Sequence, residues 1–307
     1  MDLAGMAKRQ DVAHRMPGRQ CQADGKEDTI MVSTTAFLFM VITLVISLIL
    51  PVLLLIVYGV ANKGKKVVSA WFLGAAGFFV MQIIIRVPIL NGLSVMPGFQ
   101  SFAIEHYVMY VLLLGFTAGL FEVVGRLAVA KIMSKELTYR RGFAAGLGHG
   151  GIEAIVLIGM TYINNLAYAT MINGGTFDAT VAQAAATGVD VSSLYAAKEA
   201  LISTPAYLFG LAGYERLLTM ICHVALTLLV CYFVTKKQTV KGVLISLVLH
   251  TILDSASGLI NGLSTPYMGS VISQNTAYVL IYVFLTLMTV LAVVGIVRMR
   301  KNWDKIN

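Results

Sequence analysis

A His and a Glu stand four residues apart in the apolar stretch from Arg140 to Met160. The spacing of His149 and Glu153 places both side chains on one face of a helix, about one turn apart. An imidazole and a carboxylate placed in this way can bind a metal ion together or exchange a proton with water. Ionisable groups are costly inside an apolar span, so we treat the pair as a candidate functional site.

Other apolar stretches carry ionisable residues in similar patterns. Glu122 and Arg126 are four residues apart in one stretch. His250 and Asp254 are four apart in another, and His223 stands in a third. Each of these groups would face the interior of a helical bundle, because ionisable side chains avoid lipid.

Each group also has a purely structural interpretation. The Glu/Arg pair can be a structural ion pair, and His149 can donate to a backbone carbonyl of a neighbouring helix. Arg86 is expected to pair with a carboxylate or to extend its guanidinium to the interface. Glu215 and Arg216 are expected to pair at the interface.

The composition predicts a membrane protein. The chain of 307 residues is 58% hydrophobic and 12% charged, against roughly 25% charged residues in an ordinary soluble domain. Apolar runs of about 20 residues recur, which is enough to cross a hydrocarbon core about 30 Å thick. The net charge of +8 does not indicate nucleic-acid binding, because the basic residues lie where loops would meet lipid. The three cysteines show no CxxC motif.

The predicted fold is an all-α polytopic membrane bundle of about seven transmembrane helices. Residues 1–33 are interpreted as a disordered tail, or as the result of a misassigned start if Met31 is the first residue. Residues 34–301 form the membrane domain, with an external loop over residues 164–206 that contains weak amphipathic helices, and residues 302–307 form a cytoplasmic tail. The predicted spans cover about residues 35–60, 68–90, 103–133, 143–163, 207–234, 242–263 and 277–297.

The distribution of Lys and Arg predicts the orientation. With the N-terminus outside and the C-terminus inside, 14 basic residues flank the spans on the cytoplasmic side, against Lys198 alone in the external loops. Five basic residues in the tail oppose this orientation, but they drop out if Met31 is the first residue. The 14 are Lys63, Lys65, Lys66, Lys131, Lys135, Arg140, Arg141, Lys236, Lys237, Lys241, Arg298, Arg300, Lys301 and Lys305.

The candidate residues fall at similar depths. At 1.5 Å per residue from the nearest cytoplasmic basic residue, the His and carboxylate groups of four helices lie roughly 12–20 Å into the membrane. Gly142, Gly146 and Gly150 repeat every four residues and would let a neighbouring helix approach closely. We therefore expect one shared polar site in the cytoplasmic half or near the middle of the membrane.

Four motifs in this order resemble those of the YhfC family of intramembrane metalloproteases. They are Glu122-x-x-x-Arg126, His149-Gly-Gly-x-Glu153, His223 in the next long span, and His250-x-x-x-Asp254. That family is similar to a wider group with the type II CAAX prenyl endopeptidases, the bacterial CPBP proteins and PrsW. The chain departs from the wider group in having Phe121-Glu122 in place of a double Glu, while Glu153 matches PrsW. The resemblance covers about residues 35–300.

The resemblance implies hydrolysis of a peptide bond of a membrane-embedded or lipidated substrate, in a bacterial plasma membrane. Glu122 would be the general base on a water, helped by Glu153, and Arg126 would orient Glu122. His250 and Asp254 would bind the developing oxyanion.

In the metal version of this mechanism, zinc would be bound by His149, Glu153, His223 and His250. A glutamate-type protease without metal remains open, because the order of the motifs does not separate the two. A non-catalytic membrane scaffold of the same fold is the first alternative function. A proton-coupled transporter is the second, although no internal repeat supports it.

Overall fold

A computed structural model describes residues 31–303 of the chain, and every regular element in that range is a helix. Seven helices there are long and apolar enough to cross a membrane, which confirms the predicted all-α class and the number of spans. The interpretations of the N-terminal tail and of the last four residues concern positions outside the described range. The spans are Thr34–Ala61, Val67–Ser94, Tyr107–Ile132, Tyr139–Asn173, Ala206–Thr235, Thr239–Gly262 and Gln274–Trp303.

Three of the spans are composite, because a π-helical segment interrupts them. The first consists of α2 (Thr34–Leu44), η1 (Val45–Ile49) and α3 (Leu50–Ala61); the second of α4 (Val67–Phe78), η2 (Phe79–Arg86) and α5 (Val87–Ser94). The fourth consists of α8 (Tyr139–Glu153), η4 (Ala154–Gly159) and α9 (Met160–Asn173). The remaining spans are α7 (Tyr107–Ile132), α12 (Ala206–Thr235), α13 (Thr239–Gly262) and α14 (Gln274–Trp303).

Prolines explain two of the π-helical segments. Pro51 and Pro88 each lie within the first two residues of the α-helix that follows such a segment. Proline has no N–H, and its ring clashes with the carbonyl four residues earlier, so the preceding turn widens. Single π turns are frequent at functional sites because they rotate the side chains of one turn relative to the next.

Two boundaries differ from the sequence prediction. The fourth span does not end at residue 163 but continues to Asn173, so the first ten residues of the expected loop are helical. The rest of that stretch holds α10 (Phe177–Ala186) and α11 (Ser192–Ser203), which agrees with the expected short helices. The third span begins at Tyr107, because α6 (Pro97–Glu105) is a separate short helix that ends before it.

Small residues set the close packing of α8. The predicted glycine stripe packs on α12: a Cβ on Gly146 would lie 2.7 Å from the Cα of Val224. The opposite face of α8 packs on α4, where a Cβ on Gly148 would lie 1.9 Å from the carbonyl oxygen of Trp71. Since such distances exclude any larger side chain, α8 is held between its two neighbours at backbone contact.

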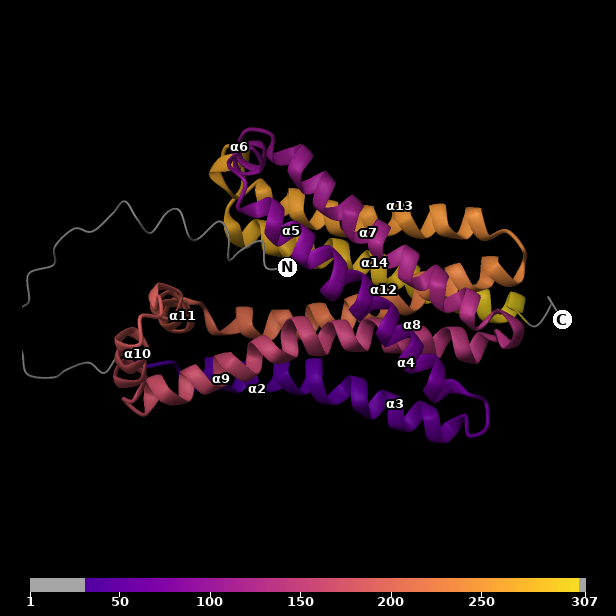
Figure 1. The fold of residues 1–307 in the computed structure, drawn as a ribbon, viewed down its shortest axis with the longest axis horizontal. Helices are drawn as coiled ribbons and strands as arrows, with labels where there is room; N and C mark the ends of the chain where they lie inside the picture. Colours follow the sequence, from indigo (N-terminus) through magenta and orange to yellow (C-terminus); the bar gives the residue numbers. More distant parts are fainter. Residues whose placement is uncertain (1–30, 304–307) are drawn as a thin grey trace, which may run out of the picture.

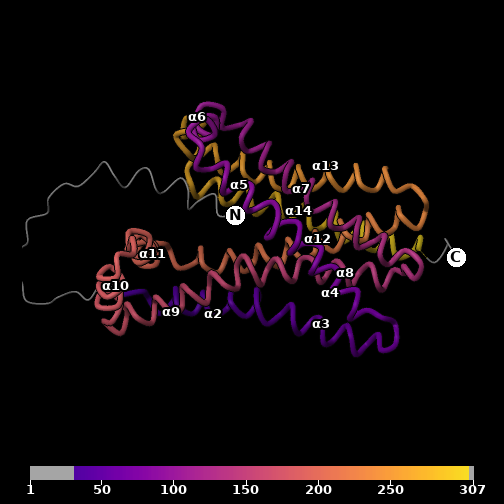
Figure 2. Tube along the Cα trace, viewed as in Figure 1, coloured from indigo at the N-terminus to yellow at the C-terminus, as the bar shows by residue number. Residues whose placement is uncertain are grey.

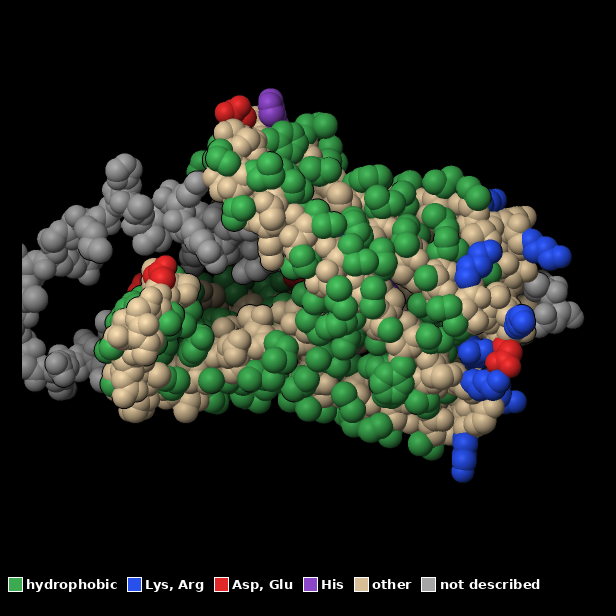
Figure 3. Space-filling model, in the orientation of Figure 1, with side chains coloured by type: hydrophobic (Ala, Val, Ile, Leu, Met, Phe, Trp, Pro, Cys, Tyr) green, Lys and Arg blue, Asp and Glu red, His purple; other side chains and the backbone are tan. Residues whose placement is uncertain are grey.

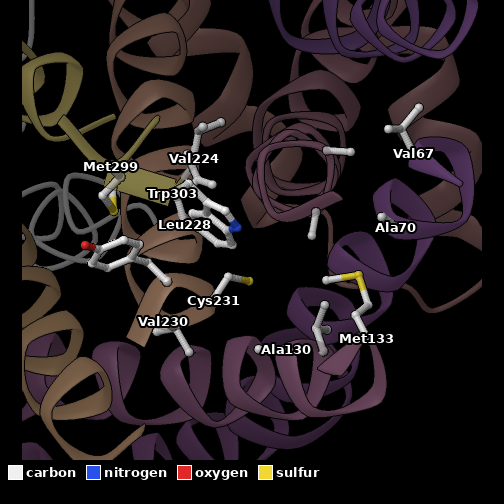
Figure 4. Close-up of a cluster of buried hydrophobic side chains, with 14 of the residues drawn as sticks. Val67, Ala70, Ala130, Met133, Val224, Leu228, Val230, Cys231, Met299 and Trp303 are labelled. Carbon is white, nitrogen blue, oxygen red and sulfur yellow. The ribbon is translucent and has the colours of Figure 1, made fainter. Parts of the chain in front are cut away.

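A cluster of buried apolar side chains closes one end of the bundle. It joins α4, α7, α8, α12 and α14, and Figure 4 shows Cys231 and Leu228 of α12 near Ala130 of α7 and Met133, the residue that follows α7. In the space-filling view the Lys and Arg side chains gather at one end of the molecule (Figure 3). The α3–α4 and α12–α13 connections lie at that end, and α10 and α11 lie at the other (Figures 1 and 2).

The end opposite the basic residues is open. Figure 3 shows the surface hollowed between the α10–α11 region and the region of α5 and α6, with acidic atoms inside the hollow. The apolar cluster at the basic end and the hollow at the other end give the bundle one closed and one open half.

Candidate active site

The predicted residues converge in the interior of the bundle. Four helices supply them, one pair each from α7, α8 and α13 and a single histidine from α12. They are Glu122 and Arg126, His149 and Glu153, His250 and Asp254, and His223. All except Asp254 are buried, so the structure brings the groups together as their common depth predicted.

Two glutamates and two histidines form the innermost group. One ligand atom from each of Glu122, His149, Glu153 and His223 lies within 4.8 Å of the corresponding atoms of the other three. The group holds Glu122 in the place that the sequence analysis gave to His250. The Nδ1 of His250 lies 3.5 Å from Glu122 Oε2, at the border of the group.

Arg126 lies among these side chains as a fixed cation. Its Nη2 donates to Glu122 Oε2 at 2.8 Å and lies 2.8 Å from His223 Nδ1. Its Nη1 lies 3.2 Å from His250 Nδ1. The guanidinium is fully buried, and these contacts spread its charge over a carboxylate and two imidazoles.

The guanidinium constrains where the histidine protons lie. Arg can only donate, so the nitrogens that it contacts on His223 and His250 are acceptors. The proton of a neutral His223 is therefore on Nε2, which lies 2.6 Å from Glu153 Oε2. His149 Nε2 lies 2.9 Å from Glu122 Oε2, the shorter of its two polar contacts, which assigns its proton to that carboxylate.

The two carboxylates are held differently. Glu122 accepts from Gln82 on Oε1, and from Arg126 and His149 on Oε2, so three donors surround it. Glu153 accepts from Arg216 on Oε1 at 3.0 Å. Its Oε2 receives no well-directed hydrogen bond from any described residue, despite the nearby His223. Glu153 therefore keeps lone pairs for a water or a cation.

The donor set fits a divalent metal of the zinc type. Histidine nitrogens and carboxylate oxygens are the ligands of catalytic zinc sites, and the four candidates are buried within one ligand sphere of each other. Glu153 Oε2 lies 2.6 Å from His223 Nε2 without a well-directed hydrogen bond between the two atoms. Two atoms placed in this way can bind one cation together. Replacement of the Nε2 proton of His223 by a metal would satisfy both atoms.

His250 and Asp254 mark the side of the group that is open to the surroundings. His250 Nε2 lies 3.3 Å from Asp254 Oδ2. The Asp254 side chain is 43% exposed, whereas that of His250 is 3% exposed. A small molecule or an extended peptide would therefore meet Asp254 first and the buried group behind it.

The contacts of three polar residues around the site, Gln82, Arg86 and Arg216, differ from what the sequence predicted. Gln82 was not singled out, although it contacts Glu122, because an amide in an apolar run carries no charge to mark it. Arg86 contacts Gln82, Leu114 and Thr117 rather than a carboxylate, so neither expected role applies.

The interpretation of Glu215 and Arg216 as an interface pair was incomplete. Arg216 does pair with Glu215, but its other Nη bonds Glu153 inside the bundle. The Glu215 side chain is 35% exposed and Arg216 is buried, so the pair links the surface to the buried group. The spacing in the sequence indicates that Arg216 faces the site. His223 lies seven residues, close to two helical turns, after Arg216 on the same face of α12.

Comparisons with known proteins agree with the geometry. The sequence profile of the family described as "YhfC intramembrane metalloprotease" matches residues 46–273. The "Uncharacterized membrane protein YhfC" of Bacillus subtilis (strain 168) is 30% identical over 225 residues, which is 73% of this chain and 84% of that protein. No solved structure matches the chain.

Proposed function

The chain belongs to the YhfC family of intramembrane metalloproteases, and on this premise we propose that it hydrolyses a peptide bond of a membrane-associated substrate. The observation that carries the proposal is the buried Glu/His group, in which two carboxylates and two imidazoles lie within one ligand sphere. Burying ionisable side chains costs free energy, and the fold alone does not need these groups. We therefore assign them a role in catalysis.

The metal of the proposed site is zinc, which would be held by His149 and His223 with Glu122 as the carboxylate ligand, and Glu153 would lie beside the coordinated water. Bound zinc would lower the pKa of a coordinated water and polarise the scissile carbonyl. Ligand nitrogens must carry a free lone pair, so both histidines would bind the metal as neutral imidazoles.

We assign the proton acceptor to Glu153 and not to Glu122. Glu122 already accepts three hydrogen bonds, one of them from a guanidinium, so both of its oxygens are engaged. Glu153 Oε2 lies close to His223 but accepts no well-directed hydrogen bond from the described residues, so it can accept the proton of an attacking water and pass it to the leaving amine. This assignment changes the division of labour that the resemblance implied, with Glu122 as base and Glu153 as helper.

Arg126, His250 and Asp254 complete the proposed machinery. Arg126 orients Glu122 and keeps a positive charge beside the site. His250 carries its proton on Nε2, at the exposed side of the group, where it can donate to the oxygen of a substrate carbonyl. Asp254 fixes that imidazole until the substrate arrives.

The proposed substrate is a membrane-embedded or lipidated peptide. Apolar spans surround the buried group, which favours a substrate from the bilayer, and Asp254 is the exposed member of the site. We place the protein in a bacterial plasma membrane, in line with its Bacillus relative.

The test uses the full chain purified in detergent and reconstituted into liposomes with a pool of synthetic single-span peptides. Mass spectrometry would detect the cleavage products. We expect the wild type to cleave, chelation to stop cleavage and added Zn²⁺ to restore it. Glu153→Gln should lose turnover, while the control Glu136→Gln at the basic end should keep it. Cleavage that survives Glu153→Gln would refute the assignment of the base, and stoichiometric zinc without cleavage of any peptide would favour the scaffold.

A further inference from the structure

The π-helical segment of the second span turns two polar side chains toward the buried group. Gln82 and Arg86 both lie in η2 and both are buried. The Nε2 of Gln82 donates to Glu122 Oε1 at 2.6 Å, the shortest hydrogen bond to that carboxylate. We propose that Gln82, held in place by Arg86, is a positioning residue that fixes the Glu122 carboxylate with its Oε2 turned toward His149.

Arg86 decides which way the amide of Gln82 points. Its Nη1 donates to Gln82 Oε1 at 3.2 Å, and because Arg cannot accept, the amide oxygen must face the guanidinium. The amide nitrogen then faces Glu122. The usual ambiguity between the two ends of a glutamine side chain is removed at this position.

Arg86 is itself anchored to the third span. Its Nη2 donates to the backbone carbonyl of Leu114 at 2.7 Å, and both Nε and Nη2 lie 3.3 Å from Thr117 Oγ1. A chain of directed hydrogen bonds therefore runs from the α7 backbone through Arg86 and Gln82 to Glu122. Because α7 also carries Glu122, the chain braces the carboxylate against its own helix.

This chain of hydrogen bonds fixes the plane of the Glu122 carboxylate. A carboxylate held at one oxygen can rotate, whereas Gln82 on Oε1 and Arg126 on Oε2 hold Glu122 at both. The bond between Oε2 and His149 Nε2 depends on this orientation. Groups that hydrogen-bond a metal-binding side chain orient it, and their loss typically lowers metal affinity 10–100-fold.

The inference rests on the proposed function only for the measurement of Zn²⁺ affinity. A purely structural role would be confined to satisfying the buried Arg86. It would leave the orientation of Glu122, and hence the environment of His149, unchanged when Gln82 is replaced. The two roles therefore differ in a spectroscopic signal that needs neither metal nor turnover.

The experiment compares the wild type with Gln82→Met, which keeps the volume of the side chain and removes the amide. The full chain carries five histidines, and ¹⁵N labelling of their rings with assignment by single substitutions identifies the signal of His149. We expect this signal to shift in Gln82→Met and the signal of the surface residue His106 to stay. The dissociation constant for Zn²⁺, measured by chelator competition, should rise about 10–100-fold.

Two further variants serve as controls, one for misfolding of Gln82→Met and one for the loss of a buried polar group elsewhere. Thr117→Val removes one acceptor of Arg86 and should give smaller changes in the same direction if Gln82→Met fails to fold. Ser246→Ala removes another buried hydroxyl, which has no partner among the described residues, and should change neither readout.

An unchanged His149 signal in a folded Gln82→Met protein would overturn the proposal. If the wild type binds no Zn²⁺, the metal part of the proposed function fails, and the His149 signal still decides the role of Gln82.

Discussion

Removal of the Arg126 side chain should leave a carboxylate charged and uncompensated inside the bundle. Glu122 and Arg126 are both buried and their closest atoms are 2.8 Å apart. The Arg126→Met variant keeps an unbranched apolar stem of similar path and removes the guanidinium. It therefore tests the charge without opening a large cavity.

The size of the effect follows from the burial. Breaking a buried ion pair by removing one partner costs about 3–5 kcal/mol, because the remaining charge has lost its counter-ion. A loss of 1 kcal/mol lowers the Tm by about 2–4 °C in domains of 150–250 residues. Arg126→Met should thus lower the Tm by roughly 6 °C or more. The double variant Glu122→Gln/Arg126→Met has no buried charge at this point, so it should recover more than half of the loss.

The assay uses the protein's own thiols. Cys222 and Cys231 are buried, so a thiol-reactive dye reports their exposure as the protein unfolds in detergent. Cys21, which lies outside the described residues, is replaced by Ser in all variants so that its thiol does not contribute.

Comparison of the Tm of Arg126→Met with that of the double variant tests whether Glu122 and Arg126 interact. If Arg126→Met and the double variant have the same Tm, Glu122 and Arg126 are not coupled and the electrostatic account of the site is wrong. A Tm of Arg126→Met within about 1 °C of wild type would lead to the same conclusion.

Three further predictions concern packing, metal affinity and topology. Gly148→Ala should destabilise the protein by about 1–3 kcal/mol or more, because its Cβ would lie 1.9 Å from the Trp71 carbonyl oxygen. Gly295→Ala, where nothing lies within 4 Å, should be neutral or stabilising by up to about 1 kcal/mol, and equal Tm values for the two would refute the packing. Arg216→Gln should weaken Zn²⁺ binding roughly 10–100-fold relative to Arg300→Gln, because it removes the donor to Glu153; equal affinities would separate Arg216 from the site. Single cysteines at Ser264 and Lys301 should react with an impermeant thiol reagent from opposite sides of the membrane, and labelling from one side would refute the topology.

The sequence predicted the spans and the meeting of the charged residues for physical reasons. Crossing a bilayer requires long apolar runs, which are visible without any knowledge of packing. Ionisable residues within such runs must turn inward, so Glu122, Glu153 and His223 meet in the interior of the bundle. The glycine stripe predicted a close helix contact, and Gly146 makes it with α12.

The missed features depend on local rotation and on side-chain reach. Gln82 and Arg86 lie in the π-helical segment η2, so the α-helical period does not predict which way their side chains face. The length of a guanidinium side chain lets Arg216 reach Glu153 from the neighbouring helix. His250 lies at the border of the innermost group, with its Nδ1 3.5 Å from Glu122 Oε2 and 3.2 Å from Arg126 Nη1. The depth of a residue along its helix does not predict the direction in which its side chain points.

The central claim is that the buried group of His149, His223, Glu122 and Glu153 binds a catalytic metal. X-ray absorption at the zinc edge of the purified, zinc-loaded full chain tests it most directly. We expect one zinc per chain with only nitrogen and oxygen ligands at about 2.0–2.2 Å and scattering from two imidazoles, and we expect this signal to be lost in His149→Ala. A sulfur ligand at about 2.3 Å, a signal unchanged in His149→Ala, or metal-free protein that cleaves at the wild-type rate would contradict it.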